Sequence, residues 1–158
     1  MKYITKKLDF SNQTLEEMNL NSKKFYNLIK NRRSVRDFKK DVIDFTIIKN
    51  AILAAGTAPN GANLQPWHFV IIKNKSIMKK IRTAAEIEEK EFYEKKAPKE
   101  WLEALKPLGT DKNKSFLEEA PYLIAVFEKK YSIKNRKKVK NYYVKESVGI
   151  ATGILISC

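Results

Sequence analysis

Cysteine and histidine are almost absent from this sequence, which has one residue of each type, Cys158 and His68. A single cysteine excludes a disulfide within the chain and suits a reducing compartment. No spacing typical of zinc ligands occurs, so we expect no bound metal. Long apolar runs are missing too. Residues 1–12 lack the apolar core of a secretory signal, and no segment approaches the roughly 18 apolar residues of a membrane span. We therefore expect a cytoplasmic protein with no membrane partner.

Low-complexity tracts and internal repeats are also absent, and the chain has the usual length of one domain. Its 158 residues are 43% hydrophobic and 11% aromatic. This composition is sufficient for a sizeable core. We expect residues 1–158 to form one globular domain.

Positive charge, in contrast, is abundant: 32 basic and 18 acidic residues give a formal net charge of +14. A field of this size attracts polyanions without sequence preference. The charge is spread along the chain except over 128–143, which we interpret as a basic loop flanked by tyrosines. No zinc-finger or aromatic-glycine RNA-binding motif accompanies it, so we expect a solvated surface and no specific nucleic-acid partner. The basic residues of this run are Lys129, Lys130, Lys134, Arg136, Lys137, Lys138 and Lys140.

Patterns typical of helices and strands are both present. Apolar residues recur at helical spacing in several segments and form short continuous runs in two others. One long helical segment is heavily charged and contains Pro98, which should interrupt it. Helices are expected within 14–31, 44–59, 76–106 and 142–157, and buried strands over 68–73 and 120–127.

Two strands make a sheet too small to stand alone, because a two-stranded unit is marginal in water. The last predicted helix is the most apolar, and the sequence stops inside it at "GILISC" without a glycine cap or a polar turn. Its small residues Gly149, Ala151 and Gly153 permit close packing against another helix. We expect either further residues or another chain to cover this helix.

Arginine is scarce, and three of the five arginines fall within the stretch "NRRSVRDF", at Arg32, Arg33 and Arg36. A planar guanidinium is preferred over lysine where an anion must be held in a fixed geometry. The cluster therefore suggests a phosphate or carboxylate site. A solvated basic turn between two helices is the alternative.

Five segments in this order resemble the nitroreductase family of flavin enzymes, and within it the iodotyrosine deiodinase branch. They are "RRSVRDF", "GTAPNGANLQPWHFVIIKN", "EIEEKEFYEKK" followed by a tryptophan, "APYLIAVF" and "YYVKESVGIATGIL". The resemblance implies an α+β fold with a central sheet flanked by helices, in a dimer that binds FMN at the subunit interface. It also implies that the C-terminal part of the family's chain is missing here.

The resemblance also implies a set of cofactor contacts. The arginine segment would bind the FMN phosphate and the polar edge of the flavin, and the turn "PNGANLQPW" would lie along the flavin ring. Trp67, at the end of this turn, we interpret as a core residue. The implied cofactor-binding residues are Arg32, Arg33, Ser34, Val35, Arg36, Pro59, Asn60, Gly61, Asn63 and Gln65.

In the deiodinase branch a mobile lid, here about 76–118, holds the zwitterion of a halogenated tyrosine. The matching residues are Glu89, Tyr93 and Lys114, and the N–H of Ala62 would receive the phenolate oxygen. Glu89 and Tyr93 share one face of a helix because they are four residues apart. A solvated helix rich in acids and lysines could also contain this pair by chance.

The resemblance implies an FMN-dependent oxidoreductase that removes halide from halotyrosines, with the flavin rather than a protein side chain carrying the chemistry. NAD(P)H or a reductase would supply the electrons. One alternative is a general NAD(P)H-dependent nitroreductase for nitroaromatics or quinones. The other is a truncated, non-catalytic remnant of the family. We expect a small aromatic substrate and a homodimer.

Overall fold

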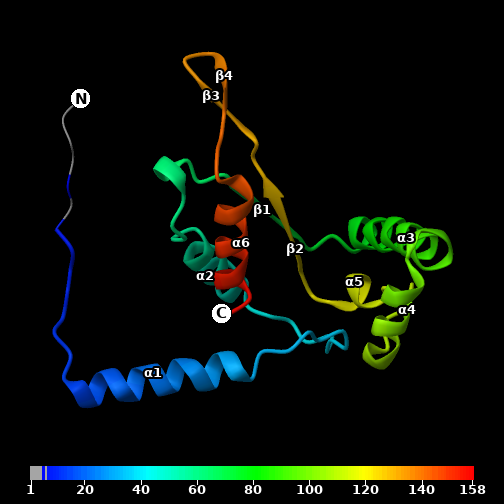
Figure 1. Cartoon of the computed structure of the whole chain (residues 1–158), viewed down its shortest axis with the longest axis horizontal. Helices are drawn as coiled ribbons and strands as arrows, with labels where there is room; N and C mark the ends of the chain where they lie inside the picture. The colour runs from blue at the N-terminus through cyan, green and yellow to red at the C-terminus, as the bar shows by residue number, and fades with distance from the viewer. Residues whose placement is uncertain (1–4, 6) are drawn as a thin grey trace. The chain divides into compact units, whose positions relative to one another are not determined.

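The computed structural model describes residue 5 and residues 7–158, and these form two compact units (Figure 1). The first contains the chain up to Ser34 with helix α1 (Leu15–Lys30), and the second runs from Val35 to Ile156. The expectation of one domain over residues 1–158 stays a prediction.

Helix α1 begins with a capping box. The side chain of Thr14 accepts the Glu17 N–H at 3.2 Å, and the Glu17 carboxylate accepts the Thr14 N–H at 2.7 Å. No residue of α1 is buried. Among its apolar side chains, Leu15 is 76% exposed, Phe25 64% and Leu28 60%. The local sequence therefore determines where α1 begins, but the described chain does not bury its apolar face.

The second unit mixes helices with antiparallel strands, and the predicted α+β class is confirmed. Both predicted strands are present, and the long charged segment breaks on either side of Pro98 as expected. Among the described residues, no helix is both long and apolar enough to cross a membrane. In chain order the elements are α2 (Phe45–Ala55), η1 (Gly61–Asn63), β1 (Trp67–Ile72), α3 (Lys75–Glu91), η2 (Phe92–Lys96), α4 (Lys99–Leu105), η3 (Lys106–Leu108), α5 (Phe116–Glu119), β2 (Leu123–Glu128), β3 (Tyr131–Lys134), β4 (Lys137–Lys140) and α6 (Val144–Leu155).

Strands β1 and β2 pair antiparallel, from Trp67 opposite Glu128 to Ile72 opposite Leu123. This pairing gives the unit two distinct ends. At the Ile72–Leu123 end the chain leaves β1 for α3 and enters β2 from α5 (Figure 1). At the other end the turn before β1 meets the chain after β2, where the Lys129 N–H donates to the Pro66 carbonyl at 2.8 Å.

The core lies where α6 packs on this sheet and against α2. Its buried residues are Ala58, Trp67, Val148 and Ala151, so the interpretation of Trp67 as a core residue is confirmed. Most side chains of β1 and β2 are only half-buried, although both strands were expected to be buried. A sheet of two strands leaves its side chains with few neighbours, which accounts for the difference.

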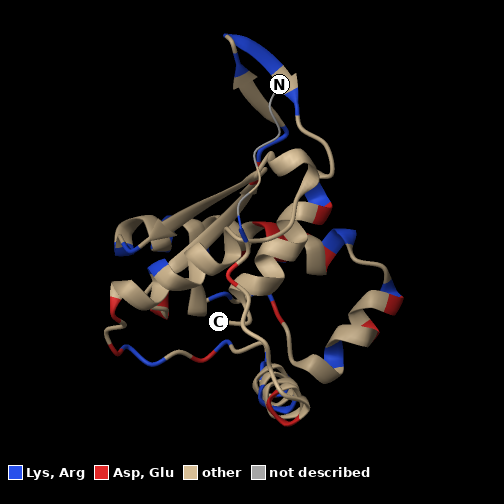
Figure 2. Cartoon of the chain, turned by 90° about the vertical axis from the view of Figure 1, so that its left-hand side faces the viewer, with Lys and Arg blue, Asp and Glu red and all other residues tan. Residues whose placement is uncertain are grey.

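The basic run is a hairpin, and the prediction of a loop over 128–143 is wrong. Strands β3 and β4 pair antiparallel around Asn135 and Arg136, which both have left-handed φ angles of 49° and 61°. A two-residue turn of this kind matches the twist of a hairpin but usually contains glycine, whose absence hid the signal. The buried Asn141 holds the base, where its side-chain amide donates to the Lys129 carbonyl at 2.7 Å. Figure 2 shows lysine and arginine in blue around the turn of the hairpin and along part of its strands.

Gly61, in the turn before β1, lies against two tyrosines that precede α6. A Cβ atom at this position would stand 3.0 Å from Tyr143 Cδ2 and 3.2 Å from Tyr142 Cε2. The two rings contact each other edge to face, with centroids 5.7 Å apart. Packing against these rings is therefore a sufficient reason for glycine at position 61.

Replacing Gly61 by alanine should destabilise the fold by about 1–3 kcal/mol, because the added methyl group over-packs this contact. Urea unfolding measures the change. Val42→Ile is the matched control, because it adds one carbon to a side chain that is 94% exposed. Equal unfolding midpoints for Gly61→Ala and the parent would contradict this prediction, because the tyrosine rings would then shift without any loss of stability.

Candidate functional site

The turn between α2 and β1 contains the residues expected along a flavin. The Asn60 side chain closes this turn: its amide donates to the Ala58 carbonyl at 3.1 Å, and its oxygen accepts the Gln65 N–H at 2.8 Å. Ala62, Asn63 and Gln65 have left-handed φ angles of 47°, 52° and 46°. Such angles cost energy for residues other than glycine, and they cluster at functional sites. The turn is therefore a strained segment that the Asn60 side chain holds in place.

Two amides of this turn remain available. The side chains of Asn63 and Gln65 are exposed, and neither makes a hydrogen bond within the part of the chain that the structure describes. Pro59 is also exposed. The turn thus presents two free amide groups, while the amide of Asn60 is already used.

The arginine segment spans the boundary between the two units, with Arg32, Arg33 and Ser34 in the first unit and Arg36 in the second. Arg33 Nη1 donates to the Lys30 carbonyl at 2.7 Å and to the Arg32 carbonyl at 2.8 Å. It thereby satisfies carbonyls at the C-terminal end of α1. The side chains of Arg32 and Arg36 are exposed and make no ion pair with any described residue. Val35 is 57% exposed.

Glu89, Tyr93 and Lys114 come together in the structure. Lys114 Nζ lies 3.0 Å from Glu89 Oε2 and donates to the Asp111 carbonyl at 2.7 Å. The Tyr93 hydroxyl is 3.1 Å from Thr110 Oγ1. The Lys114 side chain is only 15% exposed, so this ion pair is partly shielded from water. Two elements supply the three residues: the helical stretch of α3 and η2, and the loop that precedes α5.

These three side chains line a cavity of about 430 Å³ whose other walls are mostly apolar. Phe92 and Trp101 contribute rings whose centroids are 6.3 Å apart, and Phe92 also meets Tyr93 edge to face. A charge pair of opposite signs therefore stands at the edge of an aromatic cavity. The remaining lining residues are Ala104, Leu105 and Thr110.

The turn at 59–65 and this cavity do not form one site within the chain. The turn precedes β1 and α3 follows it, so the two lie at opposite ends of a six-residue strand. A strand of this length spans about 20 Å. Ala62, the residue expected at the phenolate, is not among the residues that line the cavity.

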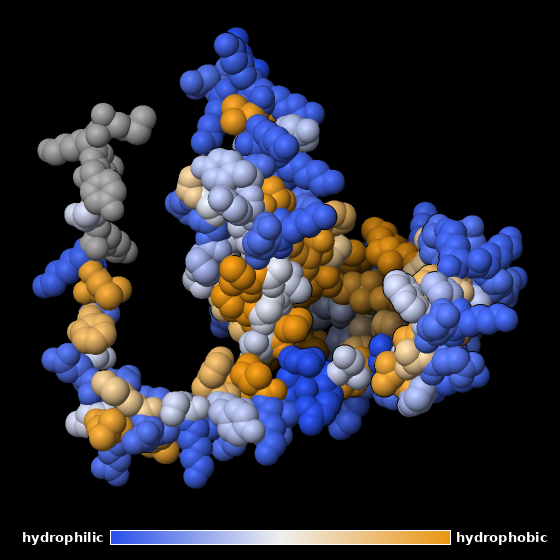
Figure 3. All heavy atoms as spheres, viewed as in Figure 1, coloured by the Kyte–Doolittle hydropathy of each residue, from blue (hydrophilic) through white to orange (hydrophobic). Residues whose placement is uncertain are grey.

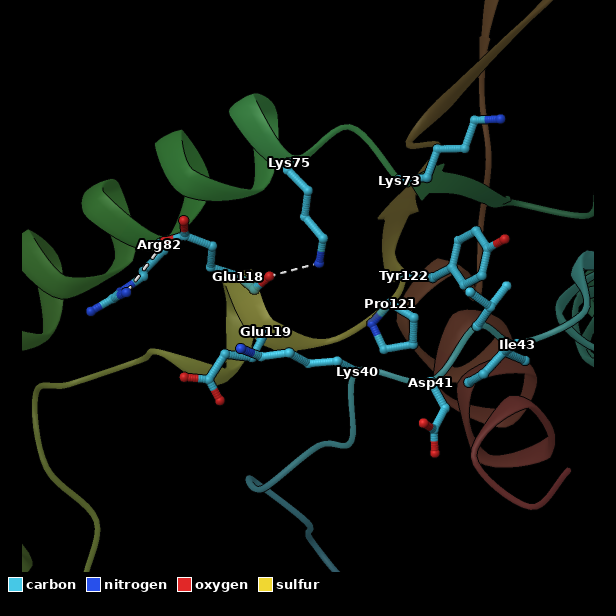
Figure 4. Close-up of a pocket in the computed structure, with 11 residues that line it drawn as sticks. Lys40, Asp41, Ile43, Lys73, Lys75, Arg82, Glu118, Glu119, Pro121 and Tyr122 are labelled. Atoms are coloured by element: carbon cyan, nitrogen blue, oxygen red, sulfur yellow. Dashed lines mark hydrogen bonds and ion pairs between the residues drawn. The ribbon is translucent and has the colours of Figure 1, made fainter.

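Sequence reasoning missed two charged residues within the lid segment, Arg82 and Glu86. Glu86 Oε1 accepts the Lys114 N–H at 2.9 Å and also Arg82 Nε at 2.9 Å. Arg82 Nη1 reaches Glu118 Oε2 at 3.2 Å, as Figure 4 shows for the neighbouring pocket of about 610 Å³. The spacing of Arg82 and Glu86, one helical turn apart, was the available signal. Their distant partners gave no local pattern, because Glu118 lies 36 positions after Arg82 and Lys114 lies 28 positions after Glu86.

These contacts shift the carboxylates toward their charged forms. The Lys114 N–H, and next the Arg82 guanidinium, lower the pKa of Glu86 below its ordinary value of 4.5. The side chain and main chain of Asn113 likewise lower the pKa of Asp111. Both groups are therefore anions at neutral pH, and their hydrogen bonds are charge-assisted.

The chain is similar to several characterised proteins. A sequence profile described as the nitroreductase family matches residues 29–156. The iodotyrosine deiodinase of Haliscomenobacter hydrossis is 49% identical over 90% of this chain and 64% of its own length. Iodotyrosine deiodinase 1 of Rattus norvegicus is 41% identical over 90% of this chain and 50% of its own length. The chain thus spans between half and two thirds of these two relatives.

Solved structures agree with the sequence comparison. An iodotyrosine deiodinase bound to FMN and 3-iodo-L-tyrosine matches with a TM-score of 0.72 and 35% identity, over 84% of this chain and 67% of that one. An FMN-dependent nitroreductase from Clostridium difficile matches in fold, with a TM-score of 0.57 and 22% identity over 86% of this chain and 55% of that one. The predicted nitroreductase-like fold is thereby confirmed, and the chain belongs to the nitroreductase family.

Proposed function

We propose that this chain is part of an FMN-dependent oxidoreductase that removes halogen from halotyrosines. The observation that carries the proposal is the Glu89–Lys114 pair, with 3.0 Å between Oε2 and Nζ, at the edge of an apolar aromatic cavity. Similarity to iodotyrosine deiodinases supports the same substrate class. The single cysteine suits a reducing compartment, so we place the protein in the cytoplasm.

The charge pair fits an amino-acid zwitterion. The substrate ammonium would bind the Glu89 carboxylate and the substrate carboxylate would bind Lys114, while the Tyr93 hydroxyl adds a neutral hydrogen bond. Without substrate, Glu89 and Lys114 neutralise each other, so neither charge is left unpaired in a partly shielded place. A zwitterion brings one charge of each sign and can replace both partners at once. The Ala62 N–H would receive the phenolate oxygen.

The available side chains fit FMN. Arg32 and Arg36 are exposed and unpaired, which suits a phosphate, and the free amides of Asn63 and Gln65 suit the amide-like edge of a flavin. Arg33, Ser34, Val35, Pro59 and Gly61 complete the proposed contacts, with Asn60 holding the turn from within. Bound reduced FMN supplies two electrons which, with a proton, replace a carbon–halogen bond by a carbon–hydrogen bond and release halide. NAD(P)H or a reductase is the proposed electron source.

A homodimer would join the separate parts of the site. The turn at 59–65 and the lid cavity stand at opposite ends of β1 in one chain, and a second copy can supply whichever part is missing. Unburied apolar surface supports association. A groove of about 940 Å³ runs along α2, β2 and α6, and Figure 3 shows apolar side chains gathered over this part of the second unit. Gly149 and the 45% exposed Ile150 lie on the outer face of α6.

Removing one free arginine should weaken FMN binding. Arg32→Ala and Arg36→Ala should each cost about 1.5–3 kcal/mol, the usual contribution of a hydrogen bond to a charged group. Titration of the apoprotein with FMN, followed by flavin fluorescence, measures the affinity. Arg136→Ala in the hairpin turn is the matched control and should leave it unchanged. If all three variants bind FMN like the parent, the arginine assignment is wrong. A parent chain that binds no FMN would instead favour the non-catalytic remnant.

Removing the lid lysine should abolish a preference for amino acids. The parent, loaded with FMN, should bind 3-iodotyrosine at least about tenfold more tightly than an iodophenol without the amino-acid group. Lys114→Ala should erase most of this preference and leave the FMN content unchanged. Lys112→Ala is the control, because Lys112 pairs with Glu94 at 3.4 Å outside the cavity. Equal binding of both phenols by the parent would favour a general nitroreductase.

A larger side chain on the outer face of α6 should prevent dimer formation. We expect the parent to be a dimer by light scattering at micromolar concentration and Gly149→Gln to be a monomer. A side chain at this position meets no atom of its own chain within 4 Å at Cβ, so the fold should persist, with an unchanged circular dichroism spectrum. A dimeric Gly149→Gln protein would place the interface elsewhere, and a monomeric parent would contradict the homodimer.

A further inference from the structure

Four residues form one stripe along α3 and its continuation: Arg82, Glu86, Glu89 and Tyr93. Their spacing of four, three and four residues places them on one face of the helix. Glu89 and Tyr93 belong to the proposed substrate site. Arg82 and Glu86 extend the same stripe by two helical turns, and the proposed function gives them no role.

Glu86 and Glu89 hold the same residue at two different points. Glu86 Oε1 accepts the main-chain N–H of Lys114 at 2.9 Å, whereas Glu89 Oε2 pairs with the Lys114 ammonium at 3.0 Å. The two carboxylates stand on successive turns of α3. One therefore fixes where the main chain of Lys114 lies, and the other determines where its side chain ends.

Further contacts connect the Lys114 segment to α3. Arg82 donates to Glu86 through Nε at 2.9 Å and to Glu118 through Nη1 at 3.2 Å, so it links the helix to α5. Lys75 Nζ donates to the Glu118 carbonyl at 2.8 Å (Figure 4) and to the Ala120 carbonyl at 2.8 Å. The Lys114 carbonyl accepts the Leu117 N–H at 3.0 Å, which joins the lysine to the first turn of α5. Of these α3 residues, Glu86 is the one that bonds to the main chain of Lys114.

Substrate binding should affect the two contacts of Lys114 differently. A zwitterion that binds between Glu89 and the Lys114 ammonium must break their ion pair. The Glu86 hydrogen bond involves only the main chain, so it can persist while the ammonium turns to a substrate carboxylate. Holding a flexible lysine by its main chain lowers the entropy cost of placing its charge.

We propose that Glu86, oriented by Arg82, is a positioning residue that holds Lys114 in place to receive the carboxylate of an amino-acid substrate. The inference rests on the proposed halotyrosine function and assigns a role to residues outside the cavity lining. Glu86 does not line the lid cavity, so its proposed effect passes through Lys114.

Binding measurements test the role of Glu86. Glu86→Ala should reduce the preference for 3-iodotyrosine over the matched iodophenol by at least about fivefold, with unchanged FMN content and unchanged iodophenol affinity. Glu86→Gln keeps an oxygen that accepts the Lys114 N–H and should retain part of the preference. Glu88→Ala is the control, because Glu88 lies on the same helix with a 76% exposed side chain. In a Lys114→Ala background, Glu86→Ala should have no further effect.

An effect of Glu86→Ala that persists in the Lys114→Ala background, or a loss of iodophenol binding as well, would show that Glu86 supports the fold generally and would overturn the proposal. Full preference in Glu86→Ala would overturn it too.

Hydrogen exchange separates this inference from the proposed function. The Lys114 amide should exchange at least about tenfold faster in Glu86→Ala than in the parent, and at the parent rate in Glu88→Ala. This readout needs no substrate. If the parent shows no preference for iodotyrosine, the proposed function fails and the substrate role of Glu86 fails with it, even where exchange reveals the grip on Lys114. An unchanged Lys114 exchange rate in Glu86→Ala would overturn the inference alone.

Discussion

The antiparallel pairing of β1 with β2 is the constraint on which the second unit depends. The register that sets Ile72 opposite Leu123 places the start of α3 beside the end of α5. It also sets Trp67 opposite Glu128, which brings the turn before β1 to the base of the hairpin. A slip by one residue would turn every side chain of one strand to the opposite face and move its flanking segment by about 3.4 Å. The hydrogen bonds between α3 and the Lys114 segment, at 2.9 and 3.2 Å, would not survive that movement.

The lid combines charges and aromatic rings in a way that explains both its resting state and its proposed substrate. An unpaired charge beside an apolar cavity is energetically costly, so Glu89 and Lys114 form an ion pair with each other when no ligand is bound. A ligand that brings only one charge leaves one partner unpaired. A zwitterion with a ring satisfies both charges and fills the apolar space. In the proposed function, the side chains would thus select by the number and sign of charges as well as by shape.

The described chain leaves much apolar surface without a partner. Helix α1 buries none of its residues, and the groove beside α2 and α6 is lined largely by apolar side chains. A two-stranded sheet supplies little core, since only Ala58, Trp67, Val148 and Ala151 form the buried cluster. The stability of such a chain depends on what covers these faces, and the parts of the proposed site lie at opposite ends of the same sheet. Association would therefore serve stability and function together.

Part of this architecture could be predicted from the sequence, because it depends on neighbours within a few residues. Apolar spacing indicated the helices and both strands of the main sheet, Pro98 indicated the break after the charged helix, and the spacing of Glu89 and Tyr93 placed them on one helical face. The hairpin was not predicted because its turn, Asn135 and Arg136, lacks the usual glycine.

Contacts between distant segments could not be predicted from local sequence patterns. Family resemblance, and no local pattern, placed Lys114 with Glu89, and neither resemblance nor pattern indicated the links of Arg82 and Glu86. Likewise, the resemblance implied that Asn60 contacts FMN, and only the structure revealed that its side chain closes the turn. The sequence by itself determined the elements and the types of charge that they carry. Only the tertiary structure decided which charges meet, because that depends on a strand register set by the summed packing of many side chains far apart in the chain.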